Sequence, residues 1–143
     1  MLQKSILHNG IRVVTERMPD LHSATIGFWV QNGSRHETEE LNGISHFIEH
    51  MLFKGTKTRS SLQIAKEIDS VGGVLNAFTG REFSCYYAKI LGDKLPQAIS
   101  LLSDLVLNSM FDETEIEKER RVILQELSMV DDTPDDQIND LFC

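Results

Sequence analysis

Residues His46-Phe47-Ile48-Glu49-His50 combine two imidazoles and a carboxylate within one short run. On an α-helix, residues four apart lie one above the other, so His46 and His50 can direct ring nitrogens at a single metal ion. Glu49 lies beside them, where a carboxylate can take a proton from a metal-bound water and return it to a leaving group. The spacing therefore predicts a metal site with the chemistry of a zinc hydrolase.

A tetrahedral zinc site takes a third protein ligand and leaves one position open for water. Glu119 and Glu126 are seven residues apart, so they share one helix face and can both approach the metal. Glu126 lies between apolar Leu124 and Leu127, and we expect it to be the buried, metal-facing carboxylate. Glu119 then supports a histidine from outside the ligand set. The remaining candidates are the two cysteines, Cys85 and Cys143, and two further glutamates, Glu115 and Glu117. The two glutamates lie in a charged run that is typical of a solvated helix face.

Apolar residues at helical spacing predict four helices that position these groups. The first begins at residue 42 or 43, carries both histidines and ends at Gly55; the second begins at Ser60 or Ser61 and ends at Gly72 and Gly73. The third covers residues 93–109, with a core face of Leu95, Ala98, Ile99, Leu102, Leu105 and Val106. Asp112 and Glu115 form a capping box for the fourth, whose apolar positions are Ile116, Val122, Ile123, Leu127 and Val130.

Shorter runs with β propensity predict the strands. Residues 5–7 and 11–14 flank an Asn-Gly turn and form a first hairpin, residues 24–30 form a third strand, and residues 74–79 and 83–91 form a second hairpin. Strands and helices occur in separate groups without a βαβ repeat, which indicates an α+β fold with an antiparallel sheet packed against helices. We expect one more short helical piece after Pro134.

Composition narrows the classes of function. The 143 residues carry 14 basic and 22 acidic side chains, a net charge of −8, which argues against nucleic acid and favours basic partners. No stretch reaches the roughly 20 apolar residues of a membrane helix, and the N-terminus lacks the features of a signal peptide. Two cysteines make no disulfide framework, so a reducing cytoplasm fits best, and Cys85 is expected to be a small buried apolar residue.

Three segments resemble the inverted-zincin peptidases, the family of pitrilysin, insulin-degrading enzyme and mitochondrial processing peptidase. They are GISHFIEHMLFKGT at residues 43–56, LNAFTGRE at residues 75–82 followed by Tyr86 and Tyr87, and EIEKERRVILQE at residues 115–126. His50 and Glu126 are 76 positions apart, which resembles the spacing of the distal glutamate ligand in that family. Within this family, the sequence looks most like the bacterial members that are similar to the processing peptidase.

This resemblance implies roles for individual residues. It implies one zinc ion per chain, with Glu49 as general base, Glu119 as supporting carboxylate of the catalytic centre, and a ligand set of His46, His50 and Glu126. It also implies an edge strand beside the metal, where a substrate adds as an extra strand along Asn76, Ala77 and Phe78. An unpaired strand edge can bind any extended peptide through backbone hydrogen bonds.

The resemblance also bears on domain organisation. The family members that this sequence resembles are much longer chains, in which a second, related half supplies an Arg and a Tyr near the zinc. We therefore expect residues 1–143 to be an incomplete N-terminal zinc-binding domain, part of the first repeat of a metallohydrolase domain of the processing-peptidase type. Such a domain would work as a homodimer or pair with a related half or subunit.

The leading hypothesis is a zinc endopeptidase for short or unfolded peptides, in which Glu49 activates water for attack on the scissile carbonyl. A first alternative is a non-catalytic binding or assembly subunit of the same fold, although the intact His46, Glu49, His50 and Glu126 argue against it. A second is a small metal-dependent lyase resembling the autoinducer-2 synthase, in which Cys85 or Cys143 would replace Glu126.

Overall fold

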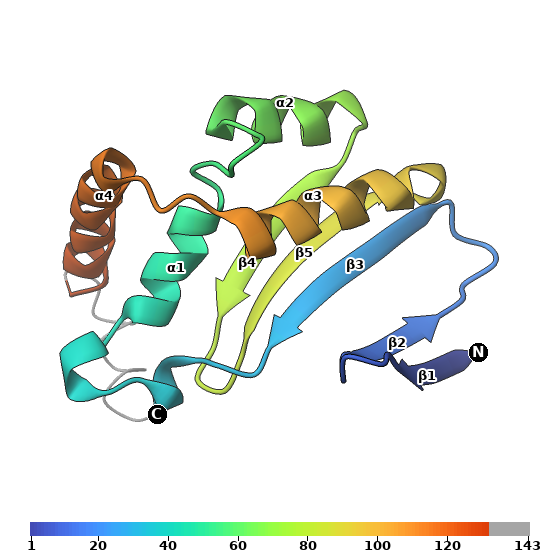
Figure 1. Cartoon of the computed structure of the whole chain (residues 1–143), viewed down its shortest axis with the longest axis horizontal. Helices are drawn as coiled ribbons and strands as arrows, with labels where there is room; N and C mark the ends of the chain where they lie inside the picture. The colour runs from blue at the N-terminus through green and yellow to red at the C-terminus, as the bar shows by residue number, and fades with distance from the viewer. Residues whose placement is uncertain (132–143) are drawn as a thin grey trace.

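The computed structural model describes residues 1–131, which form an α+β fold with two antiparallel sheets and four α-helices (Figure 1). The strands are β1 (Leu2–Ile6), β2 (Arg12–Glu16), β3 (Ser23–Val30), β4 (Val74–Thr79) and β5 (Ser84–Leu91). The helices are α1 (Ile44–Leu52), α2 (Ser61–Ser70), α3 (Leu95–Asn108) and α4 (Glu113–Asp131), with short 3-10 turns at Ser34–His36, Glu39–Leu41 and Gly92–Lys94. The expected fold class is confirmed, and the short helix expected after Pro134 lies outside the described residues.

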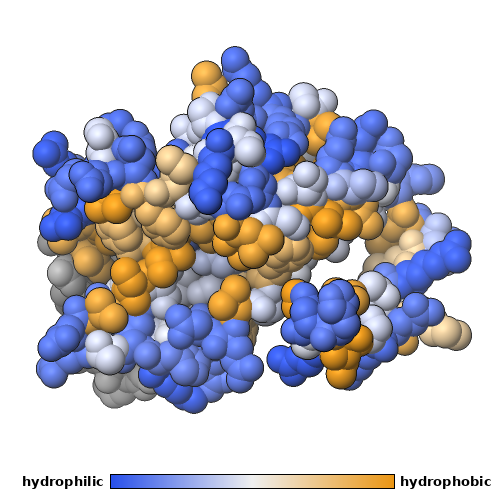
Figure 2. All heavy atoms as spheres, in the orientation of Figure 1, coloured by the Kyte–Doolittle hydropathy of each residue, from blue (hydrophilic) through white to orange (hydrophobic). Residues whose placement is uncertain are grey.

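Strand pairing gives a two-stranded sheet, β1-β2, and a three-stranded sheet in the order β3-β5-β4. Both expected hairpins are present, but β1 and β2 pair from Leu2 opposite Glu16, beyond the expected ends, because backbone pairing continues past the apolar residues. In this view the β1-β2 hairpin is separated from the other strands and helices (Figures 1 and 2). In the larger sheet, β4 is an edge strand within residues 1–131.

The core lies between one face of the β3-β5-β4 sheet and helices α1, α2 and α3. β5 contributes Tyr86, Ala88 and Ile90 at alternate positions, as expected of a strand with one covered face. Apolar residues gather in a band between the polar outer surfaces of the molecule (Figure 2). Cys85 is buried with 2% of its surface exposed, as expected.

The buried face of α3 differs from the expected one. Ile99 is 42% exposed, whereas Leu101, which the pattern did not select, is 2% exposed. On a helical projection Leu101 lies within the arc that contains Ala98, Leu102 and Leu105, and Ile99 lies at its flank. The sheet covers only this arc, so the helix is rotated relative to the expected face.

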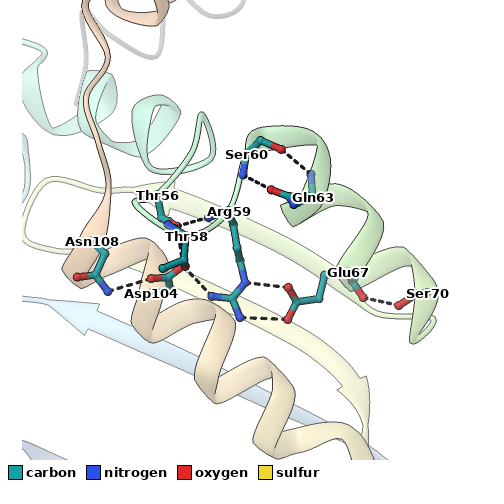
Figure 3. Close-up of polar contacts among 9 residues, drawn as sticks. All are labelled: Thr56, Thr58, Arg59, Ser60, Gln63, Glu67, Ser70, Asp104 and Asn108. Atoms are coloured by element: carbon teal, nitrogen blue, oxygen red, sulfur yellow. Dashed lines mark hydrogen bonds and ion pairs between the residues drawn. The ribbon is translucent and has the colours of Figure 1, made fainter.

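Asp104 on α3 is the centre of a polar cluster that ties the loop between α1 and α2 to α3 (Figure 3). Its carboxylate accepts hydrogen bonds from the hydroxyls of Thr56 (2.6 Å) and Thr58 (3.0 Å), from Arg59 Nη1 (2.7 Å) and from Asn108 Nδ2 (2.9 Å). Burial alone raises the pKa of Asp104, but these four donors outweigh it and hold the pKa well below its usual range.

The start of α1 is fixed by a carboxylate from the preceding loop. Glu37 accepts hydrogen bonds from the backbone N–H groups of Gly43 (2.7 Å) and Ser45 (2.8 Å), which the first turn of a helix otherwise leaves unpaired. The loop is itself anchored on the β4-β5 turn, because the N–H of Ser34 donates to the carbonyl of Gly80. Gly33 lies so close that an added Cβ would be 2.3 Å from that carbonyl oxygen.

Helix α4 packs against α1, and the Asp112 carboxylate caps its start by accepting from the N–H groups of Thr114 and Glu115. The other half of the expected capping box is not formed, because the Glu115 side chain pairs with Lys118. Two of its expected apolar positions are nevertheless exposed, Val122 at 39% and Leu127 at 52%. Among residues 113–129 of this helix, the half-buried and buried ones are Glu115, Ile116, Glu119, Ile123 and Glu126. No helix within residues 1–131 has both the length and the apolar character to cross a membrane.

Asp104→Asn tests the polar cluster. Because the pKa of Asp104 is below the ordinary value of about 3.9, its carboxylate stabilises the fold at neutral pH and loses this contribution as the pH falls below about 4. We expect the substitution to lower the free energy of unfolding by about 2 kcal/mol at pH 7, and by less at pH 3, in urea titrations. The control Asp93→Asn, at an exposed position, should change it by less than about 0.5 kcal/mol. An equal loss at both pH values would contradict the assignment.

Glu37→Ala tests the cap of α1. Loss of the two hydrogen bonds should reduce the free energy of unfolding by about 1 kcal/mol, the usual effect of removing a helix cap. Glu40→Ala removes an exposed glutamate from the same loop and serves as the control in parallel urea titrations. Equal stability of the two variants would show that Glu37 does not cap the helix.

Candidate metal centre

Two imidazole nitrogens and one carboxylate oxygen converge at the contact between α1 and α4. His46 Nε2 and His50 Nε2 are 3.2 Å apart, and Glu126 Oε2 lies 3.7 Å from the first and 3.5 Å from the second. Ligands about 2.05 Å from a tetrahedral zinc ion are separated by about 3.3 Å. The three side chains, one ligand atom each, thus form a group whose spacing fits zinc.

Glu119 holds His50 from the other side of the ring. Its Oε2 lies 3.0 Å from His50 Nδ1, so a proton on Nδ1 leaves the lone pair of Nε2 free to face the other ligand atoms. Its second oxygen forms an ion pair with Lys54 Nζ. Burial alone raises the pKa of Glu119, but the hydrogen bonds from Lys54 and His50 outweigh it and keep the pKa below its usual range. Glu119 is therefore an anion that fixes the orientation of an imidazole.

Glu49 lies in a cleft of about 230 Å³ beside these groups. The cleft is lined by Glu49, His50, Phe53, Lys54, Asn76 and Glu119. Within residues 1–131, no hydrogen bond or ion pair occupies the Glu49 carboxylate. Burial, and secondarily the charge of Glu49, raises the pKa of Tyr86, which is 5% exposed. A carboxylate in this position can exchange a proton with a molecule bound in the cleft.

Glu126 is less buried than the sequence predicted, and Glu119 is the buried glutamate of the pair. The Glu126 side chain is 45% exposed and the Glu119 side chain is 7% exposed. The physical reason is that α1 covers only one stripe of α4, so apolar Leu124 and Leu127 face outward and do not bury the residue between them. Glu126 faces the histidines from a half-open position.

The β4 residues of the expected substrate edge have different surroundings. Asn76 lines the cleft of Glu49, and its Oδ1 accepts a hydrogen bond of 2.8 Å from the N–H of Ala77. Ala77 is buried in the core between sheet and helices. Phe78 is 42% exposed on the opposite face of the sheet, where its ring contacts Trp29, Phe83 and Tyr87. The structure thus brings Asn76, and not the rings of Phe78 and its neighbours, to the metal group.

Within residues 1–131, the other candidate ligands are not part of the group. Cys85 pairs with Trp29 and Phe78 across the sheet and is absent from the set of converging ligand atoms within the described residues. Glu115 forms an ion pair with Lys118, and Glu117 pairs with Arg120. Cys143 lies outside the described residues.

Sequence reasoning gave no role to Lys54 or Glu37. Lys54 follows His50 by four residues, so the same helical periodicity that pairs His46 with His50 extends to it and could have identified a cation beside Glu119. Glu37 acts through a loop contact across eight residues to Ser45, for which the sequence contains no periodic signal.

Comparisons of the sequence and fold with known proteins identify the family of this chain. The model of the insulinase family, peptidase family M16, matches residues 12–142. An uncharacterized zinc protease of Bacillus subtilis is 48% identical over 99% of the chain, and one of Mycobacterium tuberculosis is 49% identical over 98%. The crystal structure of a protease from Helicobacter pylori superposes with a TM-score of 0.91 at 27% identity over 96% of the chain.

The chain spans about a third of the length of these proteins: 34% of the Bacillus relative, 32% of the Mycobacterium relative and 33% of the Helicobacter protease chain. The family match, in contrast, covers nearly all of the chain itself. This chain therefore belongs to the insulinase family of peptidases, family M16.

Proposed function

We propose that this chain is the metal-binding part of a zinc endopeptidase that cleaves short or unfolded peptides and holds one zinc ion. The observation that carries the proposal is the convergence of His46 Nε2, His50 Nε2 and Glu126 Oε2 at the spacing of a tetrahedral zinc site. The names of the relatives as zinc proteases support the choice of metal and reaction class.

Each remaining group has a role in peptide hydrolysis. When bound, zinc supplies a polarised carbonyl and a water of lowered pKa. The Glu49 carboxylate takes the proton of the attacking water and returns it to the nitrogen of the leaving amine. Glu119 keeps His50 in the orientation and tautomer of a ligand, and Lys54 neutralises the charge of Glu119.

An extended peptide is the substrate that suits the edge of β4, which no other strand of residues 1–131 covers. The N–H of Ala77 bonds to the Asn76 side chain, so it points away from β5 and toward the edge. A peptide added there would pass the cleft that contains Glu49 and Asn76. The net charge of −8 favours basic segments in the peptide. A related half, a related subunit or a second copy would enclose the half-open site.

Zinc affinity tests the ligand set. Glu126→Gln should weaken zinc binding by more than the roughly 10- to 100-fold that loss of an outer partner costs, and Glu119→Gln should fall within that range. Competition with a chelator and elemental analysis provide the two measurements, with Glu117→Gln as the exposed control on the same helix.

Cys85→Ala distinguishes the alternatives. Loss of zinc only in Cys85→Ala would favour the lyase, and a folded wild-type protein without zinc affinity would favour the non-catalytic subunit. Unchanged affinity in Glu126→Gln would place the third ligand elsewhere.

Glu49→Gln tests the general base. The amide cannot accept the proton, so the turnover number for an unfolded peptide should fall by at least roughly 100-fold while zinc remains bound in stoichiometric amount. Mass spectrometry of the products and elemental analysis are carried out on the protein at its natural full length, beside Glu117→Gln. Full activity of Glu49→Gln would refute the assignment.

A further inference from the structure

A second hollow lies next to the metal group, between α2 and the start of β4. This groove has a volume of about 370 Å³, near the lower end of the range for ligand pockets, and its main lining residues are Phe53, Ile64, Ala65, Ile68, Val74 and Leu75. Phe53 also lines the cleft that contains Glu49 and His50, so the two hollows share this residue. Apart from the hydroxyl of Ser61 and the carboxylate of Asp69, the side chains that line the groove are apolar.

The backbone of β4 relates this groove to a peptide at the edge. Because the N–H of Ala77 points away from β5, and backbone groups alternate in direction along a strand, those of Leu75 also face the edge. The side chains of Leu75 and Ala77 lie on the face covered by the helices. Residues opposite one another on paired strands direct their side chains to the same face. A peptide residue opposite Leu75 therefore directs its side chain into the groove.

We infer that this groove is a specificity site for one large apolar side chain of an extended peptide, two residues away from the peptide residue opposite Ala77. The inference rests on the proposed function, in which the peptide pairs with β4. Burial of a Leu side chain against Ile64, Ile68 and Phe53 removes apolar surface from water, whereas an acidic side chain would lie near Asp69 and be repelled. The groove thus selects a residue that takes no part in the reaction.

Binding to two matched peptides tests the inference. The probes are fluorescein-labelled ten-residue peptides of Ser, Gly and Lys, one with a single central Leu and the other with Ser at that position. The protein is the zinc-loaded Glu49→Gln variant at its natural full length, so that the peptides stay intact. Fluorescence anisotropy should give a dissociation constant about tenfold lower for the Leu peptide.

Two further substitutions on α2 show whether the groove causes this preference. Ala65 is an exposed groove residue, so Ala65→Trp should fill the groove without disturbing the core and should abolish the Leu preference while leaving the Ser peptide unaffected. Leu62 is 61% exposed and lies outside the groove, so Leu62→Trp should preserve the tenfold ratio.

A Leu preference that survives in Ala65→Trp, or no preference at all, would overturn the inference. Tighter binding when Lys replaces the central Leu would also overturn it, because the groove would then select charge. The proposed function is tested separately by wild-type hydrolysis. Hydrolysis without a Leu preference would contradict only the groove, and a Leu preference without hydrolysis would contradict only the peptidase.

Discussion

The buried Glu119 carboxylate is the constraint on which the metal group depends. An anion in this position is stable only when it is paired, and its partners are His50 and Lys54, both supplied by the region of α1. This contact fixes the register of α4 against α1. Two turns further along the same face of α4, Glu126 then meets both imidazoles. One ion-paired group therefore positions a second carboxylate that needs much less burial of its own.

A second acidic group, Asp104, connects the helices of the rest of the fold. Asp104 joins α3 to the loop that follows α1, and Arg59 extends the link to Glu67 on α2. The three helices that cover the sheet are thus tied to one another through polar groups as well as through the core. Helix α1 also packs directly on β4, which places the histidine-bearing helix beside the strand edge.

The sequence was sufficient for those features that depend on local periodicity or local turns. It predicted the helical pairing of His46 with His50, the cap at Asp112 and the β4-β5 hairpin, all of which involve residues close together in the chain. It was insufficient where burial depends on docking. Which arc of α3 meets the sheet decided the exposure of Ile99 and Leu101, and how much of α4 meets α1 decided that of Glu126.

Gly33 carries a consequence for how the protein tolerates change. It belongs neither to the core nor to the metal group, yet the carbonyl of Gly80 leaves no space for a methyl group there. A side chain at this position would push the loop off the β4-β5 turn and withdraw Glu37 from the start of the histidine-bearing helix. A substitution at Gly33 would therefore have the same effect in an activity screen as a substitution in the metal group, although Gly33 is not a metal ligand.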